Sequence, residues 1–261
     1  MDILGVTVFG DLAPAQMAGL VAVYVIAFLL KGVFGYGAVS MMVVGSALII
    51  PPHQAVVLAA VTNFYTQIQL IPRSLRDGDR QVAGKLIIWT LPSVVAGVWL
   101  FASLEARWLS LAIGLFILFL VISEVFGLIG RMAPLVQRHT AVAGPIASTV
   151  AGLIGGFLGA GAMVFISVYV RMLCAEKMLF RGTMILVGTI FIVWRFSVLL
   201  VGGIIGIPVL MEAAILAPIC FMASHIGIKL VSHIPNALFF RLYQGILILA
   251  ALMLVYQTLT G

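Results

Sequence analysis

The stretch Gly32-Val33-Phe34-Gly35-Tyr36-Gly37 (break 1) returns 124 residues later as Gly156-Phe157-Leu158-Gly159-Ala160-Gly161 (break 2). Each stretch follows one apolar run and precedes a short second run, which predicts an interruption between two helices. Four further landmarks keep the same order in both halves: Thr62-Asn63 and Gly182-Thr183, Leu91-Pro92 and Ala217-Pro218, Gly97 and Gly227, and Gly114 and Gly245. A glycine-rich membrane chain also offers chance matches, but the shared order favours an ancient duplication.

The composition decides the class of protein. Of the 261 residues, 64% are hydrophobic and 8% are charged, and the mean hydropathy is +1.27. Soluble proteins are about 45–50% apolar and about 25% charged, and disordered chains combine low hydrophobicity with high charge, so both classes are excluded. The net charge of +6 does not indicate a nucleic-acid partner, because the basic residues are spread thinly between apolar runs. The composition predicts an integral membrane protein in a lipid bilayer.

The apolar runs predict helices. Ten segments can be placed, at residues 15–30, 37–50, 54–71, 84–103, 107–128, 141–155, 161–173, 182–201, 208–232 and 236–258. A membrane-spanning helix needs about 20 apolar residues, whereas strands of a membrane barrel alternate in polarity. Residues 109–125 are apolar on every side, with one charge, so we expect an all-α protein. The second and seventh segments, which follow the breaks, are too short to cross comfortably.

The number of segments predicts an inverted repeat. Each half holds five segments, and an odd number makes the second copy run upside down relative to the first. We therefore expect one transporter domain made of two inverted membrane repeats, residues 1–128 and 129–261. Basic residues mark the cytoplasmic side, and alternation of the segments places eleven of the fourteen on that side or at its interface: Arg73, Arg76, Arg80, Lys85, Arg131, Arg138, Arg171, Lys177, Arg181, Lys229 and Arg241. We expect a multi-pass protein of the plasma (inner) membrane with both termini on the non-cytoplasmic side.

The breaks can be arranged in two ways. The flanking segments either cross fully and return, or form re-entrant hairpins whose tips meet near mid-membrane. Broken helices at equivalent positions of inverted halves indicate the binding site of a transporter. In the re-entrant arrangement the helices beginning near Ala38 and Ala162 direct free N–H groups at an anion. The alternative is that the glycines only allow tight helix packing, which is equally expected for Gly152 and Gly156.

Two cations, Lys31 and Arg195, are not explained by the assignment of basic residues to the cytoplasmic side. Arg195 lies deep in an apolar segment, where a charge costs about 2.5–3.5 kcal/mol, so it either lines a site or snorkels to the interface. Lys31 begins break 1. It lies either near mid-membrane or at the cytoplasmic side as one more charge there.

The polar residues of the third segment either bind the anion or form hydrogen bonds between helices. Thr183 holds the corresponding place in the second half. The predicted anion-binding residues are Lys31, Gly32, Gly35, Gly37, Ala38, Thr62, Asn63, Thr66, Gln67, Gly156, Gly159, Gly161, Ala162, Thr183 and Arg195.

Nothing in the sequence indicates an enzyme. The four histidines are scattered, and there is neither an HExxH nor a CxxC motif, so we expect no catalytic residue, no metal and no cofactor. The two cysteines are predicted to be buried free thiols. Three groups, Glu124, Glu212 and His225, could titrate in a proton-coupled cycle, but their positions near segment ends favour an interfacial location.

The chain resembles the TauE/SafE family of sulfite exporter-like membrane proteins from about residue 15 to residue 257. The resemblance rests on paired glycine-rich segments, here Gly35-Tyr36-Gly37-Ala38 and Gly159-Ala160-Gly161-Ala162. This chain has alanine at both last positions, where a further glycine is usual. It also has Cys174-Ala175-Glu176 where many relatives have a proline- or glycine-containing turn.

The resemblance implies a transporter of small sulfur-containing or organic anions such as sulfite, sulfonates and sulfoacetate. We expect a secondary transporter that exports such an anion by alternating access at a central site. The alternatives are proton-coupled uptake of small organic anions and a channel-like anion conduit. A homodimer is compatible with the sequence, which does not determine the oligomeric state.

Overall fold

The structure is a computed structural model of the chain, and it describes residues 2–3, 6–7, 9, 12–126, 138–159, 161–174, 176–231 and 235. The expected all-α membrane protein is confirmed, with one addition, a two-residue antiparallel ladder near the N-terminus. The elements are β1 (Asp2–Ile3), β2 (Val6–Thr7), α1 (Pro14–Phe34), α2 (Ala38–Ala47), α3 (Pro52–Gln67), the 3₁₀ turn η1 (Ile68–Leu70), α4 (Ile71–Asp77), α5 (Arg80–Ser103), α6 (Ala106–Val125), α8 (Thr140–Phe157), α9 (Ala162–Leu173), α10 (Lys177–Val201) and α11 (Ile207–Val231). The helices α1, α5, α10 and α11 are long and apolar enough to cross a membrane.

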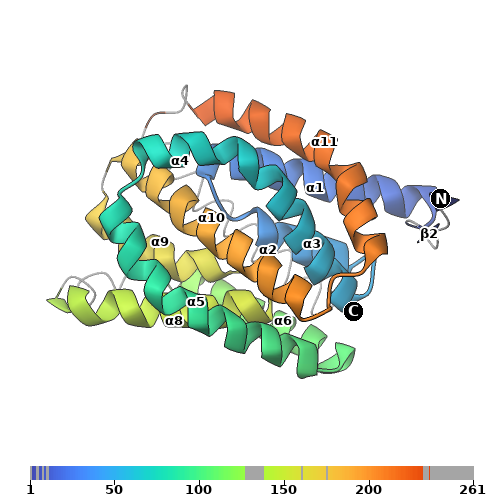
Figure 1. Cartoon of the computed structure of the whole chain (residues 1–261), viewed down its shortest axis with the longest axis horizontal. Coiled ribbons are helices and arrows are strands. Elements are labelled where there is room, and N and C mark those ends of the chain that lie inside the picture. The colour runs from blue at the N-terminus through green and yellow to red at the C-terminus, as the bar shows by residue number, and fades with distance from the viewer. Residues whose placement is uncertain are drawn as a thin grey trace.

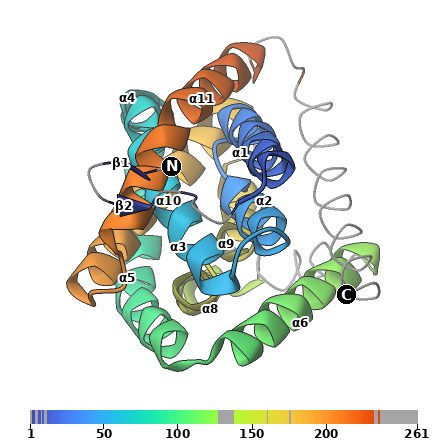
Figure 2. The same cartoon turned by 90° about the vertical axis from the view of Figure 1, so that its right-hand side faces the viewer.

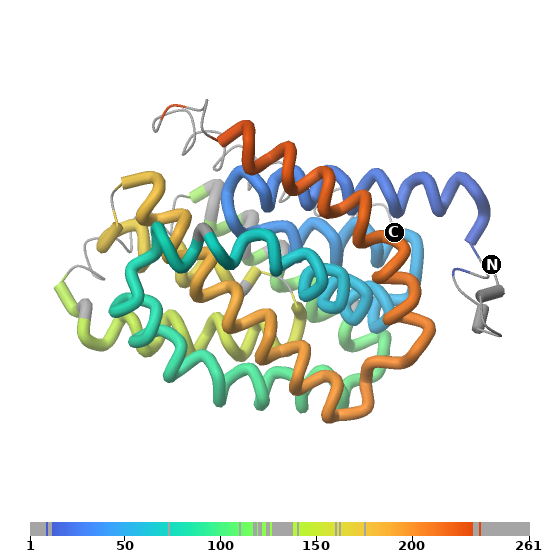
Figure 3. Tube along the Cα trace, turned by 45° about the horizontal axis from the view of Figure 1, so that its top comes forward, coloured from blue at the N-terminus to red at the C-terminus, as the bar shows by residue number. Residues whose placement is uncertain are grey.

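The helices follow the predicted segments, except that α5 and α10 begin several residues earlier than predicted. Asp79 accepts hydrogen bonds from the backbone N–H groups of Gln81 and Val82, so α5 begins four residues before its apolar run. Glu176 accepts from Met178 N, and α10 likewise begins at Lys177 instead of residue 182. The sequence also gave no indication of α4, which continues the path of α3 and η1 across the bundle (Figure 3). The predicted segment 236–258 lies outside the described residues.

Each break is the tip of a helical hairpin. In the first, a Cβ on Gly45 of α2 would meet the Val23 side chain of α1, which shows that the two helices run antiparallel. In the second, Gly144 of α8 faces Tyr169 of α9 in the same way. At 10 and 12 residues, α2 and α9 are about 15 Å and about 18 Å long, so neither can cross a bilayer alone.

The hairpins pack across the two halves of the chain. Most contacts of α1 are with α11, and most of α8 are with α5, while α2, α3, α9 and α10 lie between these two pairs (Figure 2). Backbone meets backbone in both pairs: a Cβ on Gly32 would lie 2.9 Å from Gly227 Cα, and one on Gly97 would lie 2.9 Å from Gly156 Cα. These are the glycines that the sequence comparison pairs as landmarks, and they let the helices approach closely.

The contacts also give helix directions. Along α5 and α10, Asp79 N donates to Thr183 Oγ1 and Trp194 Nε1 donates to Leu91 O, so these helices run in the same direction. At the start of α10, Lys177 Nζ donates to Val231 O at the end of α11, which therefore runs the opposite way.

The glycine contacts advance together along α5 and α8, from Gly152 at Thr90 to Gly156 at Val94, and α1 and α11 begin at the same end of the bundle (Figure 1), so α1 and α8 point in opposite directions. This agrees with an inverted repeat. The duplication itself, and the repeat boundaries at residues 128 and 129, stay predictions.

One end of the bundle carries most of the described basic residues. There α5, α8 and α10 begin and α9 and α11 end (Figure 1). The basic residues placed near it are Arg76, Arg80, Lys85, Arg138, Arg171, Lys177, Arg181 and Lys229. Arg107 lies at the opposite end, where α5 leads into α6. This grouping follows the positive-inside pattern, and the assignment of this end to the cytoplasm stays a prediction.

The glycine contacts can be tested by comparing two alanine substitutions on α5. Gly97→Ala places a Cβ against the Leu153 carbonyl and the Gly156 backbone, whereas a Cβ on Gly84 meets nothing within 4 Å. We expect Gly97→Ala to cost about 1–3 kcal/mol through overpacking, which lowers the melting temperature by at least a few degrees. Gly84→Ala should leave it unchanged or raise it. Equal melting temperatures in a thermal-unfolding series in detergent would contradict the close helix contact.

Candidate functional site

The breaks owe their shape to four matched glycines. Gly35 and Gly37 have φ of 86° and 93°, and Gly159 and Gly161 have φ of 71° and 74°. Other residues rarely adopt this left-handed conformation, because a Cβ would crowd the following carbonyl. Gly37 and Gly161 are the N-caps of α2 and α9 and supply no side-chain cap. The first turns of both short helices therefore lack the capping bond that a serine or aspartate would provide.

Break 2 contacts the helix that follows break 1. Gly161 N donates to Ser40 Oγ, in the first turn of α2, over 2.9 Å. Both breaks lie beside the interior of α10: a Cβ on Gly35 would meet the Ile185 side chain, and one on Gly159 would meet Arg195. These α10 residues lie about 12 Å and about 27 Å from the start of a helix about 37 Å long.

These contacts place the breaks between the ends of a membrane-crossing helix. Yet α1 is itself long enough to cross, so the choice between crossing and re-entrant hairpins stays a prediction.

Arg195 is a buried cation whose Nε and Nη2 atoms have no hydrogen-bond partner among the described residues. Its side chain is 3% exposed. A Cβ on Gly159 would lie 2.9 Å from Nη2, so the guanidinium rests directly against break 2. The side chain therefore points into the protein and does not snorkel toward the surface. A buried cation without a counter-charge costs several kcal/mol, which an anion bound here would offset.

The atoms left unpaired on Arg195 define a particular geometry. The Nε and Nη2 hydrogens lie on one edge of the planar guanidinium and point in the same direction, so they can donate two parallel bonds to two oxygens of one anion. A carboxylate, sulfite or sulfonate group presents such a pair of oxygens, whereas a halide does not.

Lys31 has a different environment. It lies in the last turn of α1, immediately before Gly32 of break 1, and is 2% exposed. Its Nζ donates to Asn63 Oδ1 at 2.5 Å and to Asn63 O at 3.4 Å, and it lies 5.2 Å from the Phe28 ring centroid. These partners are neutral, so Lys31 adds a positive charge to the interior while its hydrogens are directed to α3.

The polar residues of α3 mostly bond within the protein. Thr62 and Thr66 donate to carbonyls of their own helix, Leu58 O and Thr62 O. Gln67 Nε2 donates to Thr189 Oγ1 of α10, and its Oε1 has no partner. Interhelical hydrogen bonding, the competing interpretation, is thus observed for Gln67. The role of these residues in binding an anion stays a prediction.

The remaining predicted residues divide between two places. Ala38 and Ala162 open α2 and α9 at the breaks, while Gly32 and Gly156 lie in the backbone contacts of α1 and α8. Thr183 accepts from Asp79 N and lies 3.8 Å from Cys174 Sγ. It is twelve residues from Arg195 on α10, about 18 Å along the axis, so the structure does not bring these two together.

Two polar residues at the breaks were not singled out from the sequence. Arg181, expected at the inner interface, is 2% exposed, because the cap at Glu176 starts α10 early. Its Nε donates to Val33 O and its Nη2 to Gly32 O, so it satisfies carbonyls at the end of α1. Ser40 was also missed, because a lone serine in an apolar helix carries no signal of a partner in the other half.

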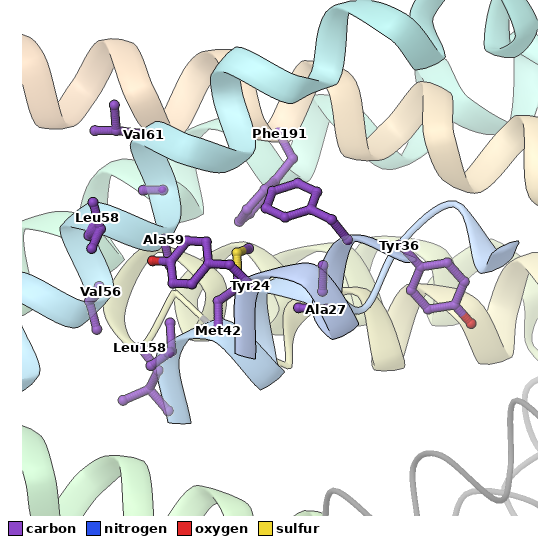
Figure 4. Close-up of a cluster of buried hydrophobic side chains, with 14 of the residues drawn as sticks. Tyr24, Ala27, Tyr36, Met42, Val56, Leu58, Ala59, Val61, Leu158 and Phe191 are labelled. Atoms are coloured by element: carbon purple, nitrogen blue, oxygen red, sulfur yellow. The ribbon is translucent and has the colours of Figure 1, made fainter. Parts of the chain in front are cut away.

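Apolar side chains fill the space beside the breaks. Met42 of α2, Leu158 of break 2, Tyr24 and Phe191 belong to one cluster of buried side chains, and the Tyr24 hydroxyl points toward α3 (Figure 4). Among the described residues no three His, Cys, Asp or Glu side chains gather as metal ligands would. The charged side chains that the structure describes in this region are Lys31, Arg181 and Arg195, and all three are cations. The binding of an anion by them stays a prediction.

Comparison with known proteins identifies the family. The family model described as "Sulfite exporter TauE/SafE" matches residues 20–254, which is most of the chain. Searches of the curated proteins and of the solved structures found no match. The matched region contains both breaks, most of α1, all of α5, α8 and α11, and every predicted binding residue. The chain therefore belongs to the sulfite exporter TauE/SafE family of multi-pass membrane transporters.

Proposed function

We propose that this protein is a secondary transporter that exports a small sulfur-containing anion of the sulfite, sulfonate or sulfoacetate type. The observation that carries the proposal is the unpaired Nε and Nη2 edge of Arg195, buried against Gly159. In the proposed complex two oxygens of the anion accept from this edge. The absence of a side chain at Gly159 lets the anion approach the backbone of break 2.

The surrounding charges support an anion over a cation. Lys31 and Arg181 add positive charge near break 1, where Lys31 donates to Asn63 and Arg181 donates to the carbonyls of Gly32 and Val33. The N-terminal ends of α2 and α9 carry partial positive charge and meet at Ser40 and Gly161. A negative-inside potential drives a monovalent anion outward by about 2.3 kcal/mol per 100 mV, so export needs no coupled ion.

Alternating access is the proposed mode of transport. The first helices of the two hairpins, α1 and α8, run in opposite directions, and the tips of both hairpins lie beside α10. Each first helix packs mainly on a long helix of the other half, α1 on α11 and α8 on α5. Rocking of one hairpin and its partner helix against the other would expose the Arg195 edge first to one side and then to the other.

Replacement of Arg195 tests the binding role. Arg195→Gln removes the charge, and Arg195→Lys keeps it but loses the two parallel donors. In proteoliposomes loaded with sulfite or a small sulfonate, we expect both variants to lose at least about tenfold in transport, which corresponds to about 1.4 kcal/mol. Arg107→Gln, at an exposed arginine of the opposite end, is the matched control and should transport normally.

Normal transport in a folded Arg195→Gln protein would overturn the assigned site. The same vesicles distinguish a carrier from a channel. Unlabelled anion on the far side should accelerate the efflux of labelled anion through a carrier, whereas a channel shows no such stimulation.

Replacement of Gly159 tests the contact between break 2 and Arg195, and Gly203, another glycine at positive φ, is the control for backbone strain. Gly159→Ala and Gly203→Ala both place a side chain at positive φ, 71° and 66°, but a Cβ on Gly203 meets nothing within 4 Å. Both should lose about 1–2 kcal/mol of stability from backbone strain. Only Gly159→Ala should weaken transport, seen as a raised KM for the anion, because its Cβ would displace the Arg195 guanidinium. Equal KM values for the Gly159→Ala and Gly203→Ala proteins would contradict a close approach of the anion to the backbone at Gly159.

A further inference from the structure

Three buried hydroxyl groups, on Tyr24 of α1, Ser46 of α2 and Thr62 of α3, form a hydroxyl cluster in the interior. All three side chains are fully buried, and Ser46 and Thr62 are neighbours of the Tyr24 hydroxyl. Within the described part of the chain, Tyr24 Oη and Ser46 Oγ form no hydrogen bond. Thr62 Oγ1 donates to Leu58 O and keeps lone pairs that can accept. Buried hydroxyls in proteins nearly always have a partner, so this cluster has the capacity to bind a polar group.

The hydroxyl cluster lies near the free edge of Arg195. A Cβ on Gly159 would lie 2.9 Å from Arg195 Nη2 and 3.1 Å from Val56 Cγ1, so the guanidinium lies beside the Val56 turn of α3. Val56 and Thr62 are six residues apart on that helix, about 9 Å along its axis. The Tyr24 hydroxyl points toward the same helix (Figure 4). The donors of Arg195 and the hydroxyl cluster are therefore less than two turns of α3 apart.

Apolar side chains connect the two polar groups. Tyr24 belongs to the same buried cluster as Val56, Leu158 and Phe191 (Figure 4). Leu158 directly precedes Gly159, and Phe191 lies one turn before Arg195 on α10. A ligand that bridges the two polar groups therefore needs carbon between its polar ends, because an oxygen placed against these side chains would lose its hydrogen bonds.

The dimensions fit a short organic sulfonate. When two carbons separate the sulfonate from a hydroxyl group, the two ends lie about 4 Å apart, and a hydrogen bond of about 2.9 Å at each end extends this to about 10 Å. This is close to the separation along α3. The cluster can both donate, from Tyr24 and Ser46, and accept, at Thr62, which matches a hydroxyl group. Inorganic sulfite has no carbon to place against the apolar side chains.

We propose that the hydroxyl cluster determines specificity by binding a hydroxyl group on the tail of an organic sulfonate. The sulfonate accepts from Arg195 Nε and Nη2, and the Tyr24 hydroxyl donates to the tail oxygen. The proton of the tail hydroxyl is donated to Thr62 Oγ1. This inference rests on the proposed function, because it names the substrate class of the same site.

Two matched sulfonates test the assignment: 2-hydroxyethanesulfonate carries the tail hydroxyl, and ethanesulfonate lacks it. Their Kd values are measured by isothermal titration calorimetry on the full chain in lipid nanodiscs. The wild type should bind 2-hydroxyethanesulfonate at least about tenfold more tightly, because ethanesulfonate leaves the buried hydroxyls unpaired. Tyr24→Phe should remove this preference and leave the Kd of ethanesulfonate unchanged. Tyr65→Phe, at a half-buried tyrosine of α3, is the matched control and should keep the preference.

Equal affinities of the wild type for the two sulfonates, or a preference that survives in Tyr24→Phe, would overturn the role of the hydroxyl cluster. If Tyr24→Phe does not fold, Ser46→Ala takes its place and should reduce the preference. Sulfite separates this inference from the proposed function. A wild type that binds sulfite through Arg195, shown by loss of binding in Arg195→Gln, but does not prefer the hydroxylated sulfonate contradicts the hydroxyl cluster alone. A wild type that binds neither sulfite nor either sulfonate contradicts the transporter proposal itself.

Discussion

Backbone contact between glycines sets the arrangement of this protein. Gly32 on α1 meets Gly227 on α11, and Gly97 on α5 meets Gly156 on α8, at distances that admit no Cβ. In a membrane the hydrophobic effect does not hold helices together, so close backbone packing carries much of their association. Because each contact joins a hairpin of one half to a long helix of the other, the breaks at the hairpin tips are brought together beside α10.

Buried positive charge beside the hairpin tips is the second feature on which the site depends. Among the described residues three cations are buried, and their partners differ. Arg181 donates to carbonyls at the end of α1 and Lys31 to the amide of Asn63, whereas the Nε and Nη2 edge of Arg195 has no partner. An unpaired buried donor costs more than a satisfied one gains. A ligand that accepts hydrogen bonds from the unpaired edge of Arg195 therefore lowers the free energy of the protein more than it would beside a satisfied cation. Glu212 near the start of α11 is buried too, and neutral N–H groups donate to its carboxylate.

Much of this could be predicted from the sequence, since the relevant signals are local. Helix positions follow from apolar runs, and the left-handed breaks follow from glycines at matching positions. Lys31 and Arg195 stood out because charges are rare in such segments. Arg181 and Glu212 were assigned to the interface, because distance from a segment end is a poor measure of burial when a cap extends the helix or a neighbouring segment covers it. Thr183 matched its counterpart in sequence, yet the fold places it beside Asp79.

The sequence alone determined the class of the protein, its helices, the two breaks and the family, because composition and glycine spacing act over a few turns of chain. The tertiary structure decided which polar groups meet: Lys31 with Asn63, Gly161 with Ser40, Glu212 with Phe9, and Arg195 with no partner for its free edge. The reason is physical. Helices that are apolar on all sides carry little information about which face turns inward, so the partners of a polar residue are set only when helices from both halves pack together.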